Sequence, residues 1–227
     1  MAYKIIGLRE DNPQGWMAAV GLLYILNKMD IDALMMWCDG FPTLPDLTDK
    51  QVIDALWEYL QKGSDLPENL PQPKPGNNKI SLDLTAGRVN FLGVIKQMIQ
   101  AVTLDDIKKA LNRRWVNQDD VTSLGWDTGA VKMAANIGGM KAPDSSPHRG
   151  VIAGQWLAAE SLPFTGTGTR SSEYKWVTWS VPLDLEGVRS LVLSLSTEWG
   201  GVVYSSSVGR NGKMGYLEPA RTMSKQK

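Results

Sequence analysis

The stretch that most constrains the fold is DNPQGWMAAVGLLYIL, at residues 11–26. It begins Asp-Asn-Pro, in which either polar residue can cap a helix and proline suits the first helical position. The apolar residues that follow predict a helix that is buried or pressed against a neighbour. Gly15 and Gly21 lie inside this run, although glycine costs a helix about 1 kcal/mol relative to alanine. Together with Ala18 and Ala19 they offer a surface for close approach, which favours a buried packing helix over a partner-binding one.

Helix caps and apolar periodicity predict further elements along the chain. Thr48 and Gln51 form a capping-box pattern before an apolar face, and Asp184 can cap a late helix. The alternating segment KWVTWSV predicts a strand at 175–181, and ISLDL predicts another at 80–84. The remaining predicted elements are helices at 91–102, from 103 onward and at 151–159, a strand followed by a loop at 34–46, a strand at 130–135, and a hairpin turning at Asn211-Gly212.

Helices and strands do not alternate regularly, so we expect an α+β fold with mainly antiparallel short strands and about six helices. Four prolines between residues 64 and 79 predict a linker or exposed loop there. The predicted organisation is an N-terminal α/β segment at 1–63, the Pro-rich linker or loop at 64–79, and an α+β core at 80–227 that ends in a basic hairpin. One continuous domain is the alternative.

Charge is balanced over the whole chain but is not evenly distributed. Lys and Arg number 24 and Asp and Glu number 24, so the protein has no strong net field for nucleic acid or an acidic membrane. Residues 128–227 carry 11 basic and 7 acidic residues, a net charge of +4. Any nucleic-acid binding is therefore expected from a local patch, in the C-terminal part of the chain.

Cysteine content and hydropathy bear on the compartment. Cys38 is the single cysteine, which excludes an internal disulfide and suits a reducing environment. The apolar run at 16–26 is too short to span a bilayer, and the residues before it lack the pattern of a secretory signal. We expect a soluble, cytoplasmic protein without membrane contact.

Few residues offer catalytic or metal-binding chemistry. His148 is the single histidine, and its Ser/Pro/Gly-rich surroundings predict a solvated loop rather than a hydrolase site. One histidine and one cysteine cannot supply a structural zinc site. The carboxylates of Asp119, Asp120 and Asp127 leave a Mg²⁺ site open as the minor alternative to ordinary caps and turns. We therefore expect no catalytic residue, no metal and no cofactor.

The segment TGTGTR, at 165–170, is the first candidate for nucleic-acid contact. It lacks the Lys-Ser/Thr ending of a phosphate-binding P-loop, so a nucleotide site is not expected. A flexible tip is one interpretation. The other is a loop with Arg170 and Lys175 that becomes ordered against a nucleic-acid backbone.

The C-terminal hairpin is the second candidate. Arg210, Asn211 and Lys213 lie at its predicted turn, and Arg221 follows it. Arg and Asn side chains can read base edges, and Lys suits phosphate. The alternative is that these residues are the ordinary surface charge of a hairpin tip.

Five segments, in order along the chain, resemble CRISPR-associated proteins of type I-U surveillance complexes, also called type I-G. DNPQGWMAAVGLLYIL resembles their opening helix, in which Asn-Pro precedes an Ala-rich Gly-Leu-Leu run. The other four are LDLTAGRVNFLG (82–93), DDVTSLGWD (119–127), GQWLAAESLPF (154–164) and WVTWSVPLDLEGVRSLV (176–192). All five are packing and turn patterns, and none is a catalytic signature.

The resemblance implies a large-subunit-like component of a Cascade-type ribonucleoprotein complex in antiviral defence. Such a subunit is a non-catalytic RNA-binding and DNA-binding protein that contacts guide RNA and target DNA, with a part in recognising the flanking motif. Its implied partners are the other effector subunits, including a backbone subunit, and a recruited helicase-nuclease.

Two other hypotheses stay open. A structural adaptor would hold other subunits of a complex together through exposed tryptophans, of which the chain has nine, although burial is their commoner fate. A metal-dependent hydrolase or nuclease would need Asp119, Asp120 and Asp127 to converge on one site.

Overall fold

The computed structural model describes residues 2–64, 66–70, 80–85, 89–130, 149–166, 171–211 and 213–223, without the side chains of Pro67 and Asn211. Within these ranges the chain forms eight helices and nine short strands, and all the strand pairings are antiparallel. The fold is therefore α+β, as predicted.

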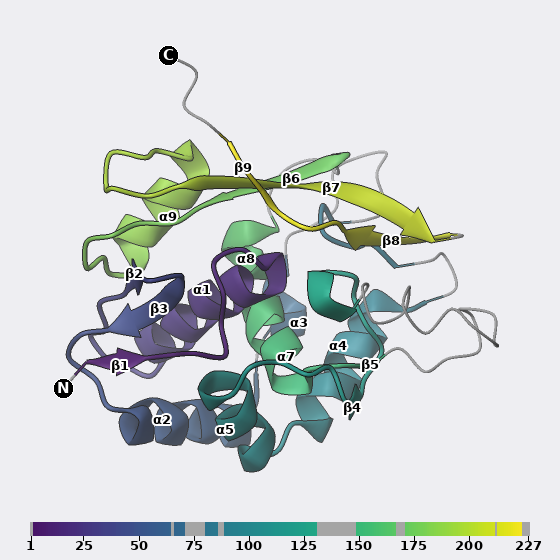
Figure 1. Cartoon of the computed structure of the whole chain (residues 1–227). Helices are drawn as coiled ribbons and strands as arrows, with labels where there is room; N and C mark the ends of the chain where they lie inside the picture. The colour runs from purple at the N-terminus through teal and green to yellow at the C-terminus, as the bar shows by residue number, and fades with distance from the viewer. Residues whose placement is uncertain are drawn as a thin grey trace.

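The predicted opening helix is α1 (Pro13–Lys28), which lies at the centre of the fold (Figure 1). Asn12 caps it, because its side-chain oxygen accepts a hydrogen bond from the Gln14 backbone N–H at 3.1 Å. All residues from Pro13 to Leu26 are buried, so the helix has no solvent-facing side over that length. The prediction of a buried packing helix is confirmed.

The main packing partner of α1 is α7 (Ile152–Glu160), which is buried along its whole length. The two helices cross at Gly21, where an added β-carbon would overlap the carbonyl oxygen of Leu157. Glycine therefore lets the two backbones come this close, and its helix-propensity cost is offset by the packing. The predicted close approach at this glycine is confirmed.

Other helices surround the α1–α7 pair (Figure 1). α2 (Asp49–Lys62) contacts α1, and α5 (Leu104–Asn112) contacts α7. Both predicted caps are present, the capping box at Thr48 and the Asp184 carboxylate, which accepts from the Gly187 N–H. Thr103 forms a further capping box at the start of α5. The remaining helices are α3 (Leu66–Asn69), α4 (Phe91–Ala101), α8 (Leu162–Thr165) and α9 (Leu185–Ser194).

A small N-terminal sheet has the order β1 (Tyr3–Lys4), β3 (Phe41–Leu44), β2 (Met36–Cys38). Asp39 and Gly40 join β2 to β3, and both have positive φ (52° and 83°), which matches a two-residue type I′ turn. The prediction of a strand followed by a loop at 34–46 was wrong in its second half, where the chain returns as β3.

The C-terminal sheet consists of β6 (Glu173–Val177), β7 (Val203–Asn211), β8 (Met214–Leu217) and β9 (Arg221–Thr222). In Figure 1 it runs along the upper side of the molecule, with α2 and α5 along the lower side and α1 and α7 between them. The Trp16 indole N–H of α1 donates to the β6 carbonyl of Val177 at 2.9 Å, which ties the central helix to the sheet.

A separate two-stranded sheet joins β4 (Asp119–Asp120) to β5 (Arg149–Gly150).

The predicted strand at 80–84 is not formed. The segment makes turns and irregular backbone, although the Leu84 carbonyl accepts from Gly215 N–H of β8 at 2.7 Å. Its alternating sequence reflects burial of Leu82 and Leu84 rather than a strand. The predicted strand at 130–135 lies outside the described residues except for Ala130, which is helical.

One hydrophobic core contains residues from both sides of the predicted linker, from Tyr3 to Leu217. Six of the nine tryptophans are buried in it, and Trp199 is the most exposed, at 49%. Burial is thus the commoner fate of tryptophan here, as expected. The buried tryptophans are Trp16, Trp37, Trp126, Trp156, Trp176 and Trp179.

Candidate functional site

The C-terminal sheet carries most of the residues predicted to contact nucleic acid. β7 is its central strand, with β6 paired along one edge. β8 and β9 share the other edge, where β8 pairs with the outer half of β7 and β9 pairs at Tyr204 and Ser205. The sheet is therefore three strands wide, and its third strand is made of two short pieces.

Side chains alternate between the two faces of this sheet. Trp176 and Tyr204, which are cross-strand partners, point inward and stack with ring centroids 5.6 Å apart. The Trp176 indole N–H donates to the Glu10 carbonyl, and the Tyr204 hydroxyl donates to the Glu10 carboxylate. We call this side the inner face. The opposite side is the outer face, which the strand registers define by Glu173, Lys175, Ser205, Ser207, Gly209, Tyr216 and Arg221.

The predicted hairpin is present, with Asn211 opposite Met214 at the end of β7 and β8. Arg210 and Lys213 are exposed, and neither has an ion-pair partner in the described part of the chain. By strand alternation Arg210 belongs to the inner-face set, opposite Gly215. The side chain of Asn211 is not among those described.

The body of the protein holds the base of this hairpin. The Gly215 N–H donates to the Leu84 carbonyl and the Leu217 N–H donates to the Gly125 carbonyl, both at 2.7 Å. The outward edge of β8 is therefore paired with irregular backbone rather than left open. The turn near Lys213 is the part of the hairpin that extends from the body (Figure 1).

Lys175 and Arg221 lie in one row on the outer face. Both are cross-strand partners of Ser205, Lys175 from β6 and Arg221 from β9. The Lys175 ammonium forms an ion pair with Glu173 at 3.0 Å, whereas Arg221 has no ion-pair partner among the described residues. A hydrogen bond from the Ser205 hydroxyl, followed by the Lys175 ammonium, lowers the pKa of the Glu173 carboxyl.

The predicted nucleic-acid residues thus form two groups rather than one patch. Arg210 and Lys213 lie at the hairpin end, and Lys175 and Arg221 form the outer-face row. Arg210 lies five positions along β7 from Ser205, a distance of roughly 17 Å in an extended strand. Arg170 lies outside the described residues, as do residues 167–169 of TGTGTR.

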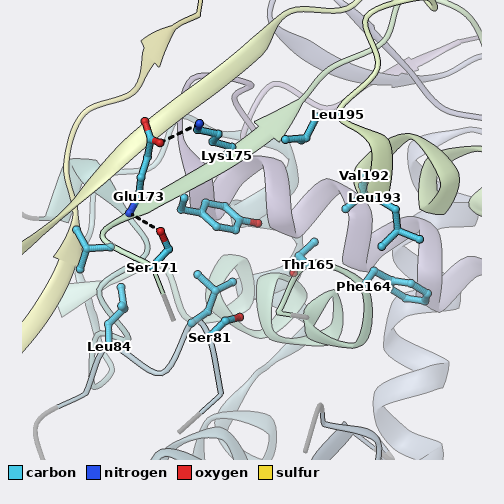
Figure 2. A pocket seen from close by; sticks show the side chains of 13 residues that line it. Ser81, Leu84, Phe164, Thr165, Ser171, Glu173, Lys175, Val192, Leu193 and Leu195 are labelled. Carbon is cyan, nitrogen blue, oxygen red and sulfur yellow. Dashed lines mark hydrogen bonds and ion pairs between the residues drawn. The ribbon is translucent and has the colours of Figure 1, made fainter. Parts of the chain in front are cut away.

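A cavity of about 340 Å³ lies where β6 faces α8 and α9 (Figure 2). Its lining is mixed, with the Glu173–Lys175 ion pair at one side and apolar side chains such as Phe164 and Leu193 at the other. The Tyr174 hydroxyl also lines it, and burial raises the pKa of this phenol. The titratable lining groups are thus an ion-paired carboxylate, its lysine and a neutral tyrosine, which do not form a nucleophile and base pair.

The three aspartates considered as a metal site have separate structural roles. The Asp119 carboxylate accepts from the Ile152 N–H at the start of α7, at 2.8 Å. Asp120 is exposed on β4. Asp127 is buried and accepts from the Asn12 amide and from the Gly129 N–H, both at 2.8 Å. They are not brought together as ligands.

Burial raises the pKa of the Asp127 carboxyl, although hydrogen bonds from Gly129, Asn12 and Asn117 oppose this shift. Its second oxygen and the Asn117 side-chain oxygen are both buried without a hydrogen-bond partner of good geometry. Asn12 also caps α1, so one amide side chain links the start of that helix to the helical turn after Asp127. The carboxylate is therefore part of a helix-capping network.

A second cavity, of about 410 Å³, lies beside the end of α1 and the start of α9. Four of its lining residues are acidic, but Asp184 caps α9 and Glu186 forms an ion pair with Arg189 at 3.0 Å. Across the residues that the structure describes, no group of three or more His, Cys, Asp or Glu side chains is arranged to hold a metal ion. His148 lies outside those residues.

One outer-face feature was missed from the sequence. Tyr216 is the cross-strand partner of Gly209, and its half-buried ring lies over this glycine, so that an added β-carbon would meet the ring at 2.6 Å. The predicted turn could not have found this pair, since a two-residue turn at Asn211-Gly212 would place Gly209 opposite Met214. In the structure Asn211 pairs with Met214, so the register is shifted and Gly209 faces Tyr216.

Comparison of the chain with protein-family models, with curated proteins and with solved structures gave no match. In the described part of the chain, no helix has both the length and the apolar character needed to cross a membrane. The contacts of the described residues are therefore the basis for the function proposed below.

Proposed function

We propose that this chain is a non-catalytic subunit of a CRISPR RNA-guided surveillance complex of the Cascade type, where it contacts guide RNA and target DNA. The observation that carries the proposal is the pair of exposed, unpaired cations, Arg210 and Lys213, at the end of the β7–β8 hairpin. The resemblance of five segments to type I-U proteins supplies the class of complex. Recognition of the flanking motif is the role that the arginine at this position suits best.

The hairpin cations differ from several other cations of the molecule in having no carboxylate partner among the described residues. Lys4, Lys50, Lys62 and Lys109 each form an ion pair with an Asp or Glu between 2.6 and 2.8 Å away. A cation that has no carboxylate partner can bind phosphate without first breaking an ion pair. The backbone hydrogen bonds that join β8 to Leu84 and Gly125 support this role because they fix the direction of the hairpin.

Two cations on α5 also have no ion-pair partner among the described residues, and they have a simpler explanation. Lys108 lies in the middle of this helix, where Lys109 and, to a smaller extent, Lys108 lower the pKa of the Asp105 carboxyl. Arg113 is the C-cap residue, where the dipole favours positive charge. They match the hairpin pair in charge and residue type. A double substitution at these two positions is therefore a suitable control.

The test is binding of the full-length chain to a fluorescein-labelled DNA duplex and to labelled RNA, measured by anisotropy over a salt series. We expect Arg210→Ala/Lys213→Ala to weaken binding about 10-fold and to reduce the slope of log K against log salt by about 2. Lys108→Ala/Arg113→Ala should leave both quantities near the wild-type values. Equal affinity of the hairpin variant and the wild type, or an equal loss in the α5 variant, would contradict the proposed site.

The assignment to a complex has its own test. Tagged chain expressed in its native host should co-purify with small RNA and with other effector subunits, including a backbone subunit. Isolation of the tagged chain free of RNA under low-salt conditions would count against this assignment, whatever the hairpin variant does.

A purely structural adaptor is the second candidate, and exposed apolar side chains favour it. Leu193 on α9 is 76% exposed and Trp199, in the connection to β7, is 49% exposed. An adaptor predicts that Trp199→Ser reduces co-purification of other subunits, while Arg210→Ala/Lys213→Ala leaves nucleic-acid affinity of the assembled complex unchanged. The subunit role proposed above predicts a loss of that affinity.

A further inference from the structure

We propose that the outer face of the C-terminal sheet binds single-stranded nucleic acid, with Tyr216 stacking on a base and Lys175 and Arg221 contacting phosphates. This inference rests on the proposed function, because it takes nucleic acid as the ligand class. It goes further by naming single strands as the ligand, the outer face as the site, and Tyr216 as a residue with a defined role.

The central strand presents small groups on this face. Ser205, Ser207 and Gly209 follow one another at alternate positions of β7. Their neighbours across the strands are larger, namely Glu173 and Lys175 on β6, and Arg221 and Tyr216 on β9 and β8. An extended polymer lying along β7 would therefore meet small serine side chains and the Tyr216 ring over Gly209, between longer side chains.

Tyr216 is held in place for stacking. Its ring lies over Gly209, so the glycine backbone supports one side of the ring while the residue stays half-buried rather than covered. An aromatic ring fixed in this way loses little conformational entropy when a base stacks on it. Bases of a duplex are already stacked on each other, so this contact suits an unstacked single strand.

The charge on this side of the sheet complements a polyanion. The outer face carries Lys175 and Arg221 against the Glu173 carboxylate. Lys213 adds a cation at the hairpin end and Glu218 follows β8, whereas Arg210 belongs to the inner-face set. Arg221 has no ion-pair partner among the described residues, and Lys175 shares its charge with Glu173. Phosphate binding at this row therefore needs no buried counter-charge to be displaced.

The distances between these outer-face residues set the direction in which a bound nucleic-acid strand would run. Strands lie about 4.8 Å apart, so the backbones of Lys175 and Arg221 are roughly 10 Å apart across β7. The row of Gly209 and Tyr216 lies four residues along β7 from Ser205, roughly 13 Å away. A nucleic-acid strand that contacts both the row of Lys175 and Arg221 and the Tyr216 ring must therefore run along β7, toward the hairpin end.

The experiment compares a labelled 15-nucleotide single strand with a 15-base-pair duplex, using the full-length chain and anisotropy. Tyr216→Leu is expected to weaken single-strand binding about 10-fold and duplex binding less than twofold. Tyr216→Phe keeps the ring and should retain wild-type affinity. Lys175→Ala/Arg221→Ala should weaken single-strand binding and reduce its salt slope by about 1.4, as expected for two phosphate contacts.

Folding and unspecific charge effects have separate controls. Thermal unfolding followed by circular dichroism should give the same midpoint for the outer-face variants as for the wild type. Lys108→Ala/Arg113→Ala removes the same two kinds of charge from α5 and should leave single-strand binding unchanged.

Unchanged single-strand affinity of folded Tyr216→Leu and Lys175→Ala/Arg221→Ala would overturn the inference. If Arg210→Ala/Lys213→Ala still weakens duplex binding, the proposed function survives that result. Both fail if none of these variants alters binding to either oligonucleotide. If Tyr216→Phe loses as much affinity as Tyr216→Leu, the stacking role of the ring is overturned. If the variants lose protein partners but keep oligonucleotide binding, the outer face binds a protein instead of nucleic acid.

Discussion

The α1–α7 crossing and the outer face of the C-terminal sheet are opposite kinds of surface. At the crossing both helices are buried on all sides, and the backbones approach so closely that one position accepts no side chain. On the outer face the side chains are polar, and Lys175, Ser207 and Arg221 are exposed. The proposed binding residues therefore lie on a surface that the packing of the core constrains little.

The largest effect is expected at the crossing. Gly21→Ala places a methyl group against the Leu157 carbonyl, and relief requires the two helices to separate. We expect the free energy of unfolding, measured by urea titration, to fall by about 3 kcal/mol despite the better helix propensity of alanine.

A glycine with more room in a helix is the control for this prediction. Gly187 lies in the first turn of α9, where an added β-carbon meets the Asp184 cap at 3.2 Å and Leu183 at 3.4 Å. Gly187→Ala should change the free energy of unfolding by less than about 1 kcal/mol. A loss at Gly21 no larger than this would show that the crossing is less tightly packed than described.

An intermediate effect is expected at Asp127, which belongs to the buried region although it was considered as a metal ligand. Asp127→Ala removes the acceptor for the Asn12 amide and the Gly129 N–H. We expect a loss of about 2 kcal/mol in the free energy of unfolding, because two donors lose their partner in a dry site.

Asp127→Asn should have the opposite sign at neutral pH. The amide keeps an acceptor oxygen and removes the buried charge, so we expect a gain of about 1 kcal/mol at pH 7. Since burial raises the folded-state pKa of Asp127, the wild type gains stability relative to this variant as pH falls through that pKa. The advantage of the variant should therefore shrink between pH 7 and pH 4. A difference that is constant over this range would contradict the raised pKa.

The smallest effect on stability is expected on the outer face. Lys175→Ala/Arg221→Ala removes an exposed ion pair and an exposed arginine, which together should change the free energy of unfolding by less than about 0.5 kcal/mol. The same variant is expected to lose affinity for single strands. A large loss of stability here would remove the contrast between the two regions.

Local signals in the sequence predicted the helices well. The capping box at Thr48 and the cap at Asp184 are formed as expected, because each signal lies within four residues of the group it satisfies. The strand predicted at 80–84 is absent. Apolar and polar residues alternate there because Leu82 and Leu84 are buried, but no strand pairs along the segment. Asp39-Gly40 is a typical hairpin turn, but Pro42 in the following segment led to the prediction of a loop instead of a strand.

The candidate site was predictable only in part. The basic hairpin followed from Asn211-Gly212, but the division between Arg210 and the row of Lys175 and Arg221 depends on the pairing of β6 and β9 with β7, which no local pattern specifies. The structural role of Asp127 depends on Asn12, 115 residues away in the chain. Contacts between residues so far apart in the chain leave no local pattern in the sequence from which they could be predicted.

The α1–α7 crossing also bears on how the protein reaches its native state. The two helices are separated by more than 120 residues of chain, so their contact closes a long loop before the core can form. Until then α1, apolar on every side, has no partner and is prone to self-association. We expect slow refolding and poor solubility of N-terminal fragments that contain α1 without α7, and recovery of solubility when the two parts of the chain are produced together.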